Sequence, residues 1–472
     1  MASVPVEAPA ADSTELKRII KLQRENAPRV GARSAAERIR KLRQFERVVM
    51  HRREEIKRAM WDDFRKPPAE VDLSEVYAVV SETRHAARHL RRWMRPHRVG
   101  GRLALLGTSS RVLYQPKGVV LILSPWNFPF NLSLAPLASA VAAGNCVILK
   151  PSEMTPASSA CMKGLLAEVF DESEVAVVEG GVEVSEALLR ERFDHIFFTG
   201  SPGVGKLVMK AAAEHLASVT LELGGKSPLL VDKTANLDVA ARRIAWGKHV
   251  NSGQTCIAPD YMLVDEAIRE EFVPKLRDAI ARLAGEGSRS IIVNERHGRR
   301  LRRLFDSAMA SGGEVITGGK FGDDERTIDY TVVRVTDESC ALMQEEIFGP
   351  ILPMVTYRTT DEALDFIARR EHPLALYIFS RDRDFINEVI ARTSAGGTVV
   401  NHTLIHFFQL NLPFGGSGHS GLGRGHGFAG FQAFSNTRAI LEQHTPISPI
   451  EFLTPPYTRL KEKLIELTVK YF

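Results

Sequence analysis

The chain lacks the marks of a disulfide scaffold and of a membrane-spanning protein. It has four cysteines in 472 residues, too few for a disulfide framework, and no CxxC pair of the metal or redox type. We therefore expect a reducing, cytoplasmic location and no metal site. No run approaches the roughly 18 uninterrupted apolar residues of a membrane span. Residues 1–12 have neither the basic start nor the apolar stretch of a secretory signal, so they read as a short disordered lead.

An excess of charge of one sign is also missing. The chain has 62 Lys and Arg residues against 57 Asp and Glu residues, which leaves a net charge of +5. Basic and acidic residues alternate, as in Arg52-Arg53-Glu54-Glu55, which is typical of a solvated helix surface. Nucleic-acid-binding proteins gather their basic residues in one tract or on one face, so we predict no nucleic-acid partner. The 44% hydrophobic fraction fits a globular chain of two or three domains.

Helices are predicted for the first hundred residues. One starts near Ser13, a second fills 35–65, and a third runs over 76–93 until Pro96 closes it. The second carries an apolar stripe that we expect in the core: Ile39, Leu42, Phe45, Val49, Ile56, Met60 and Trp61. Residues 102–114 then predict a hairpin that turns at Gly107-Thr108-Ser109 and serves as an arm for another subunit.

Strands and helices alternate after this hairpin, which predicts parallel sheets. The expected strands are 118–123, 146–149, 175–179 and 195–199, with helices at 132–143, 157–170 and 202–215. A second alternating block runs from about Val219 to Val400. The glycine-rich residues 415–430 are interpreted as a long loop. Residues 460–472 predict an amphipathic helix whose apolar stripe is Leu460, Leu464, Ile465 and Leu467, extended by Phe472.

Cys256 differs from the other cysteines in its surroundings. It ends the sequence Asn-Ser-Gly-Gln-Thr-Cys, whose small polar residues favour an accessible, activated thiol over a buried apolar one. Cys146 starts a predicted strand and Cys161 lies on an apolar helix face, so both are interpreted as structural. Cys340 has no assigned role.

Two polar side chains follow predicted strand ends. Glu222 precedes a glycine pair, which suits a carboxylate that does chemistry, although a surface Glu is the alternative. Asn127, in the sequence Pro-Trp-Asn-Phe-Pro, has an amide that can donate to an oxyanion, although a turn Asn is the alternative.

Candidate nucleotide-binding residues lie at two further strand ends. Gly200, Ser201 and Gly205 follow the strand at 195–199 and open a helix, whose N-terminus is suited to a pyrophosphate; a tight turn is about as probable on these residues alone. Lys150 and Glu153 could bind ribose hydroxyls, although a simple helix entry is the preferred interpretation in isolation.

Six motifs in this order resemble the aldehyde dehydrogenase superfamily. They are PWN, LKPSE, FTGSPxVG, ELGGKSP, NSGQTC and EEIFGP, and the resemblance covers the chain from about Ser13 to the tail. Finer sequences resemble the class 3 and coniferyl-aldehyde-type branch: TCIAPDY at 255–261, IVNERH at 292–297 and LPFGGSG at 412–418.

The resemblance implies an α/β aldehyde dehydrogenase-like fold. Its nucleotide-binding domain would comprise residues 13–100 and 115–221, and its catalytic domain residues 222–427. A small β oligomerisation arm would comprise 101–114 and 428–445, including a strand near 437–443, followed by the tail 446–472. A homodimer is expected.

The resemblance also implies the chemistry. An aldehyde, medium- or long-chain aliphatic or aromatic, is oxidised to the acid with NAD(P)⁺ through a thiohemiacetal and a thioester on Cys256. Asn127 holds the oxyanion, and Glu222 activates the hydrolytic water, so the product is a free acid rather than a coenzyme A ester.

The cofactor residues follow from the same resemblance. Lys150 and Glu346 would bind the nicotinamide ribose, Phe348 would pack near the ring, Glu153 would bind the adenosine ribose, and Ser201 with its neighbours would meet the pyrophosphate. The Glu153 charge disfavours a 2′-phosphate, so we predict NAD, with NADP possible.

Departures from the class 3 pattern concern the substrate funnel. Asn401-His402 replaces the usual Asn-Asp, and Gly425-His426 replaces a Tyr-His pair. An alternative function is a cysteine-dependent ester or thioester hydrolase without redox chemistry, which would leave the nucleotide motifs unused. A non-enzymatic scaffold is a third, lower-ranked reading, since such proteins tend to lose the nucleophile. Weak membrane association of the tail is a further possibility.

Overall fold

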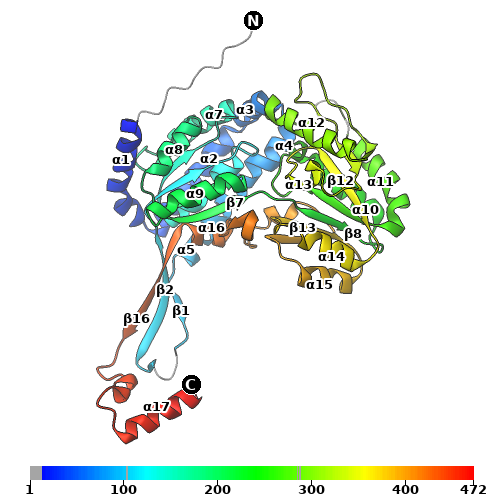
Figure 1. Cartoon of the computed structure of the whole chain (residues 1–472). Coiled ribbons are helices and arrows are strands. Elements are labelled where there is room, and N and C mark those ends of the chain that lie inside the picture. Colours follow the sequence, from blue (N-terminus) through cyan, green and yellow to red (C-terminus); the bar gives the residue numbers. More distant parts are fainter. Residues whose placement is uncertain (1–12, 102–104, 284, 286–288, 472) are drawn as a thin grey trace.

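Three β-sheets organise the molecule (Figure 1). The computed structural model describes residues 13–101, 105–283, 285 and 289–471; the predicted lead at 1–12 and Phe472 lie outside them. The strands are β1 (His97–Val99), β2 (Thr108–Pro116), β3 (Val119–Leu123), β4 (Cys146–Lys150), β5 (Val175–Val177), β6 (His195–Gly200), β7 (Ser218–Leu223), β8 (Pro228–Val231), β9 (Tyr261–Asp265), β10 (Glu314–Thr317), β11 (Thr331–Arg334), β12 (Ile351–Tyr357), β13 (Ala375–Phe379), β14 (Gly397–Val400), β15 (Gly421–Leu422) and β16 (Ser435–Gln443).

Helices cover the two larger sheets (Figure 1). The α-helices are α1 (Ser13–Gly31), α2 (Ala35–His51), α3 (Arg53–Phe64), α4 (Pro68–Val71), α5 (Tyr77–Trp93), α6 (Asn131–Ala143), α7 (Pro156–Ala167), α8 (Val182–Arg190), α9 (Pro202–Glu214), α10 (Leu237–His249), α11 (Arg269–Ala281), α12 (Glu295–Ala310), α13 (Ala341–Gln344), α14 (Thr360–Ala368), α15 (Arg383–Arg392), α16 (Gly427–Ala433) and α17 (Arg459–Tyr471). Short 3₁₀ or π turns include η1 (Asp72–Val76), η3 (Val250–Gly253), η5 (Ile405–Phe408) and η6 (Gly418–Ser420).

The predicted helix at 35–65 is two helices. Ser34 begins α2 with a capping box, in which Glu37 bonds back to the Ser34 N–H at 2.8 Å. The chain breaks at Arg52, and α3 follows. Six members of the predicted apolar stripe are buried, but Trp61 is 40% exposed. Trp61 was therefore wrongly predicted to be in the core, because the break at Arg52 ends the helical register counted from Ile39.

The first sheet has the order β15-β7-β6-β3-β4-β5 and is parallel except for β15. Its strands are buried on both faces, as parallel strands between helices require. Val120 and Ile122 pack with α2, α3, α5 and α6, whereas Val119 and Leu121 pack with α1, α8 and α9. The predicted strands of this region are confirmed.

The second sheet has the order β10-β11-β12-β9-β8-β13-β14, with only β10 antiparallel. The chain enters it after β7 ends at Leu223, close to the predicted boundary at 221–222, and returns to the first sheet once, as β15. Glu222 lies at the carboxyl end of β7. The loop that carries Cys256 (residues 250–260, the cysteine loop) lies between α10 and β9. The crossing from one sheet to the other therefore places the candidate active site between them (Figure 1).

The third sheet is a projecting ribbon of β1, β2 and β16 (Figure 1). A hairpin is present, but its bounds differ from the prediction: the first strand is His97–Val99, and Thr108 starts the second strand instead of lying in the turn. The predicted strand near 437–443 is confirmed, since β16 pairs with β2 from Ser435↔Pro116 to Gln443↔Thr108.

The C-terminal helix lies at the far end of this ribbon. The predicted tail helix is present as α17, and Figure 1 places it away from the two larger sheets. Leu460, Leu464 and Leu467 are exposed on it. No helix among the described residues is both long and apolar enough for a membrane crossing.

The glycine-rich region is more structured than the predicted long loop. Residues 418–433 form η6, β15 and α16. Close packing explains the glycines: a Cβ on Gly416 would lie 1.9 Å from the Ser420 carbonyl oxygen, and one on Gly430 would lie 2.6 Å from Ser139 Oγ. Glycine here allows backbones to touch and does not indicate a loose loop.

Candidate active site

Cys256 follows a turn with an unusual backbone. Asn251, Ser252 and Gly253 have φ values of 49°, 50° and 71°, all left-handed. A Cβ on Gly253 would lie 2.2 Å from the Gly349 carbonyl oxygen, so glycine is required there. The Gln254 side chain bonds the carbonyls of Asn251 (3.0 Å) and Ile291 (3.1 Å). These contacts fix the direction in which the chain presents Cys256.

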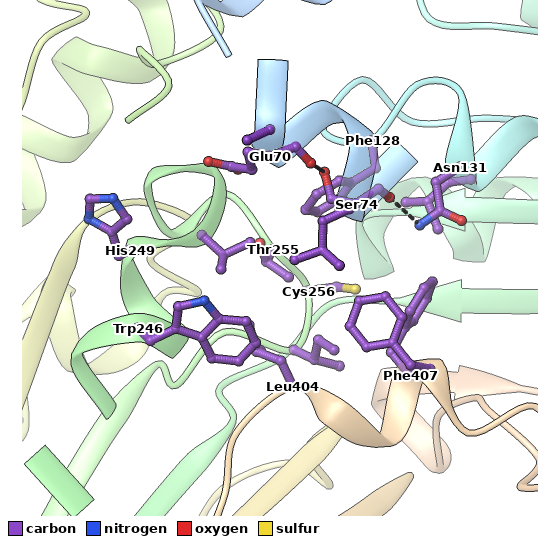
Figure 2. A pocket seen from close by; sticks show the side chains of 16 residues that line it. Glu70, Ser74, Phe128, Asn131, Trp246, His249, Thr255, Cys256, Leu404 and Phe407 are labelled. Atoms are coloured by element: carbon purple, nitrogen blue, oxygen red, sulfur yellow. Dashed lines mark hydrogen bonds between the residues drawn. The ribbon is translucent and has the colours of Figure 1, made fainter. Parts of the chain in front are cut away.

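Cys256 lines a cavity of about 290 Å³ (Figure 2). The walls are mainly apolar and come from five segments of the chain: Ala69, Leu73, Phe128, Leu132, Trp246, Val250, Ile257, Leu404, Phe407 and Phe408, with Glu70, Ser74, Asn131, His249 and Thr255 as the polar members. Figure 2 shows the sulfur of Cys256 among these side chains. Cys256 is half-buried and lines this cavity, whereas Cys146 is fully buried in the core.

The thiol is not acidified, contrary to the expectation of an activated cysteine. Burial raises the pKa of Cys256 far above its usual range, and the carboxylates of Glu222 and Glu346 raise it further. The pattern of small polar residues around Cys256 does not reveal these two distant acidic groups. The resting thiol is therefore protonated and needs a base before it can attack a carbonyl carbon.

Asn127 is held against the backbone of the cysteine loop. Its side-chain Nδ2 donates to the Gln254 backbone carbonyl at 3.0 Å, and its backbone carbonyl accepts from Asn251 Nδ2 at 2.8 Å. The residue is 2% exposed. A primary amide nitrogen carries two N–H groups, so this bond leaves one for a further acceptor.

Glu222 lines a second cavity beside the main one. The residue is 5% exposed, and this cavity of about 20 Å³ has walls that include Glu82, Gly425 and His426. Asn131 and Leu132 line both cavities, so the two cavities adjoin each other. Burial, with a further contribution from the Glu82 carboxylate, raises the pKa of Glu222 to about 8. A carboxylate with this pKa is suited to accept a proton near neutral pH.

The sequence Glu-Glu-Ile-Phe-Gly-Pro packs against the glycine pair after β7. A Cβ on Gly224 would lie 2.1 Å from Glu346 Oε2, so glycine is required beside this carboxylate. Burial raises the pKa of Glu346 to about 7, and Asp260 adds to the effect. Phe348 has a φ of 51°, and its ring meets Trp126 edge-on at 5.2 Å. Glu346 and Phe348 are thus brought to the cysteine loop.

Lys150 and Glu153 bond to each other at the end of β4. Lys150 Nζ lies 3.2 Å from Glu153 Oε2 and 2.8 Å from the Pro151 carbonyl oxygen. Lys150 is buried, whereas the Glu153 side chain is 39% exposed. A buried cation beside a half-exposed carboxylate, at the carboxyl end of a parallel strand, fits the hydroxyl groups of a nucleotide.

Gly200, Ser201 and Gly205 lie where β6 turns into α9. Ser201 is the N-cap residue, and its hydroxyl accepts from the Val204 N–H at 3.4 Å. A Cβ on Gly205 would lie 2.7 Å from Leu223 Cδ2, so this glycine lets α9 pack closely on β7. Gly205 therefore faces the sheet, while Ser201 and the helix N-terminus are exposed. This arrangement fits a pyrophosphate at the helix N-terminus.

Several residues of the site were not predicted from sequence. Lys226 donates to Glu345 O at 2.8 Å and pairs with Asp260, which accepts the Ile347 N–H at 2.8 Å. These bonds tie the glycine pair to the loop that carries Glu346. The cavity walls were also missed, because apolar residues at 73, 246, 404 and 407 carry no local signal that brings them together.

Comparisons with known proteins agree with this site. Residues 2–440 match the model of the aldehyde dehydrogenase family. The chain is 44% identical over 432 residues to aldehyde dehydrogenase family 3 member B1 of Rattus norvegicus, covering 90% of this chain and 91% of the relative. It is 42% identical over 452 residues to a probable coniferyl aldehyde dehydrogenase of Caulobacter vibrioides, covering 92% and 93%.

Solved structures give the same result. A substrate-bound structure of Staphylococcus aureus AldH superposes with a TM-score of 0.92 at 37% identity, covering 96% of this chain and 99% of that one. Similar proteins use either cofactor, since one structure of this fold holds NADP and another is of an NAD-dependent enzyme. None of these relatives is a hydrolase by name. The chain belongs to the aldehyde dehydrogenase family, in its class 3 and coniferyl-aldehyde-type branch, and oxidises aldehydes to carboxylic acids with NAD or NADP.

Proposed function

We propose that Cys256 is the nucleophile of this oxidation. The observation that carries the proposal is the position of its thiol on the wall of the apolar cavity, beside a loop that also holds Asn127. The sulfur bonds to the aldehyde carbon as the thiol proton leaves to solvent, and the electron pair of the carbonyl bond moves to the oxygen, which becomes an oxyanion. The product of this step is a thiohemiacetal.

The oxyanion of that adduct is held by two N–H groups. Asn127 Nδ2 keeps one N–H beyond its bond to Gln254, and the Cys256 backbone supplies the other. Donors fixed in advance around a developing negative charge lower the barrier, typically by about 3 to 4 kcal/mol for one donor. Asn127 is held in place because its side-chain Nδ2 and its backbone carbonyl are both bonded to the cysteine loop.

The nicotinamide cofactor is assigned to the strand ends of the first sheet. Lys150 and Glu346 would hold the nicotinamide ribose, Phe348 would pack near the ring, and Glu153 would hold the adenosine ribose. Gly200 and Ser201 would meet the pyrophosphate at the start of α9, where Gly205 lets the helix pack on β7. When bound, the cofactor supplies the hydride acceptor. NAD is favoured because the Glu153 charge repels a 2′-phosphate.

Hydrolysis of the thioester is assigned to Glu222. The carboxylate takes a proton from water while the water oxygen bonds to the acyl carbon, and the carbon–sulfur bond breaks. The acyl group is transferred to water and not to coenzyme A, so the product is a free acid. An aldehyde with a medium or long aliphatic chain, or with an aromatic ring, suits the cavity. The walls of the cavity are mainly apolar and include Phe128, Trp246 and Phe407.

The assembly and location are proposals of the same kind. The ribbon of β1, β2 and β16 projects from the body, which suits pairing with a second subunit in a homodimer (Figure 1). At its tip α17 is remote from its own cavity, so we assign it to the cavity mouth of the partner subunit. Weak membrane contact of its exposed leucines is the alternative. All four cysteines are free, which suits the cytoplasm.

The test is a panel of aliphatic and aromatic aldehydes assayed with NAD and with NADP. We expect aldehyde-dependent formation of reduced cofactor together with one equivalent of free acid. A protein that hydrolyses esters but reduces no cofactor with any aldehyde would be the cysteine-dependent hydrolase instead.

A further inference from the structure

The second cavity contains polar groups that the reaction described above does not use. Its volume is about 20 Å³, and its walls include Glu82 of α5, Ser139 of α6, Glu222 of β7 and His426 at the start of α16. Glu82 and Glu222 are 2% and 5% exposed, and the His426 side chain is 10% exposed. The cavity is therefore buried, and it adjoins the substrate cavity at Asn131 and Leu132, which line both.

Four polar atoms of the residues that line this cavity lack a protein partner. In the part of the chain that the structure describes, Glu82 Oε2, Glu222 Oε1, His426 Nδ1 and Asn131 Oδ1 are buried and make no hydrogen bond. Glu82 Oε1 is already bonded, since it accepts the Gly427 N–H at 2.8 Å and the Ser139 hydroxyl at 3.4 Å. His426 Nδ1 lies 3.9 Å from Glu82 Oε2, beyond hydrogen-bond distance.

A single water molecule fits these groups. Unsatisfied buried polar atoms are costly, and a cavity of roughly 10 to 15 Å³ suffices for one water when it has two to four polar partners. The cavity has about this room and four unpartnered polar atoms on the residues that line it. A water here would bridge Glu222 to Glu82, with His426 as its third contact.

Gly425 creates the space for Glu222 in this cavity. A Cβ at position 425 would lie 2.6 Å from Glu222 Oε1. Any larger residue would displace the carboxylate, so the glycine lets Glu222 share this cavity with Glu82. The replacement of the usual Tyr-His pair by Gly425-His426 therefore affects the surroundings of Glu222, and not only the substrate funnel.

We propose that this cavity holds one ordered water, and that through it Glu82 receives the proton that Glu222 takes up during thioester hydrolysis. The inference rests on the proposed role of Glu222. Glu82 does not contact the substrate or the cofactor. It accepts the proton of Glu222, so that Glu222 is ionised again and can act as a base.

The proton balance is complete without a further reactant. The attacking water gives one proton to Glu222 and bonds to the acyl carbon, and the carbon–sulfur bond breaks with its electron pair on Cys256 Sγ. Glu222 then gives its proton to the cavity water, whose other proton moves to Glu82 Oε2. Glu222 is ionised again, Glu82 is neutral, and no electrons are transferred.

The charges around the cavity favour such sharing. Glu222 faces Glu82, Cys256 and Arg424, while His426 faces Glu82 and His406. Burial raises the pKa of Glu82 to about 7, close to the value of about 8 for Glu222. Two carboxyl groups with similar pKa values in one buried cavity share a proton at small cost. Burial lowers the pKa of His426 to about 4, so its ring is neutral and can accept from the water.

The central experiment separates acylation from hydrolysis in Glu82→Gln. Stopped-flow measurement of reduced cofactor gives the burst for acylation and the steady rate for hydrolysis. The amide oxygen of Gln can still accept from Gly427, but the side chain no longer accepts a proton. We expect an unchanged burst rate and a steady rate lowered roughly 10- to 100-fold, the range for lost acid–base assistance. Glu82→Asp should restore part of it.

The pH profile is the second readout. Removing the negative charge of Glu82 lowers the pKa of Glu222, so the acidic limb of the steady rate should move to lower pH in Glu82→Gln. Gly425→Ala is an independent variant that changes no charge; it should displace Glu222 and slow hydrolysis while keeping the burst. Glu46→Gln removes a surface carboxylate that bonds Arg84 of α5 at 2.6 Å, and it should match the wild type.

The outcomes distinguish this inference from the function on which it rests. If Glu82→Gln and Gly425→Ala both keep the wild-type steady rate and pH profile, the inference is wrong and the function stands. A Glu82→Gln variant whose burst and steady rate fall equally shows a structural role and also overturns it. If the Glu222→Gln variant hydrolyses the thioester at the wild-type rate, both the inference and the proposed role of Glu222 are wrong.

Discussion

Lys150 Nζ and Glu153 Oε2 lie 3.2 Å apart, so the two side chains assigned to the two riboses bond to each other. Glu153→Gln keeps the length of this side chain and removes its charge. We expect the ratio of kcat/KM for NADP to that for NAD to rise about fivefold, which is the effect of roughly 1 kcal/mol between two charges near 4 Å in water. Wild-type efficiency that is equal or better with NADP would contradict the role of Glu153.

Cys256→Ala tests the nucleophile. Since the thiol forms the covalent bond, we expect aldehyde oxidation to fall below about one ten-thousandth of the wild-type rate, while the affinity for NAD stays nearly unchanged. Cys161→Ala is the matched control, because this half-buried thiol lies on α7 away from both cavities, and it should stay active. Initial rates and cofactor titration provide both measurements. Substantial oxidation by Cys256→Ala would refute the assignment.

Glu222 gives the reaction a defined pH dependence. Because burial raises its pKa to about 8, the carboxylate becomes protonated as the pH falls through that value and loses its function as a base. The steady rate should therefore rise with pH up to about 8 and level off above it. In Glu222→Gln we expect a burst of reduced cofactor, a slow steady rate and an acyl-enzyme by intact mass. A variant with no burst and normal turnover would assign the base elsewhere.

Lys66 and Glu75 test the stability of the helical wall beside the substrate cavity. Both are fully buried, Lys66 Nζ lies 2.9 Å from Glu75 Oε1, and Glu75 Oε2 accepts the Asn131 N–H at 2.9 Å. Lys66→Met leaves a buried carboxylate without its partner, which costs about 3 to 5 kcal/mol. The expected result is a clear fall in Tm by calorimetry. The exposed pair of Lys163 and Glu179 is the control, and Lys163→Met should change Tm little.

The tail is tested by deleting residues 457–472. If α17 covers the cavity mouth of a partner subunit, the deletion should raise KM for long-chain aldehydes and leave KM for short ones unchanged, since only long chains reach the mouth. A folded, truncated enzyme with the chain-length profile of the full protein would leave α17 as a structural element only. Light scattering of both proteins checks whether the deletion alters assembly.

The elements that carry the chemistry were predictable because their signals are local. The buried strand at 119–123 is an uninterrupted apolar run, and Cys256 stands in a short polar sequence that differs from its neighbours. The strand at 97–99 was missed because His97-Arg98-Val99 is short and polar, and the exposed ribbon needs no apolar face. Its pairing depends on β2, not on its own residues.

Other parts of the site depend on contacts between distant segments. Glu82 lies on a helix rich in charged residues and looks like a surface residue in the sequence. Its burial follows from α16, whose Gly427 lies more than three hundred residues later. The raised pKa of Cys256 has the same origin, because Glu222 and Glu346 approach it only in the folded chain. The cavity wall formed by Leu73, Trp246 and Leu404 is likewise a product of tertiary packing.

The left-handed turn at Asn251, Ser252 and Gly253 limits how this enzyme can be redesigned. Backbone strain and a web of side-chain bonds make the turn intolerant of exchange. Phe407 and Phe408, which line the substrate cavity, have no polar atoms in their side chains and are held by packing. Directed evolution toward a new aldehyde would therefore find its beneficial changes on the phenylalanine wall, while libraries that diversify 251–256 would return mostly inactive clones.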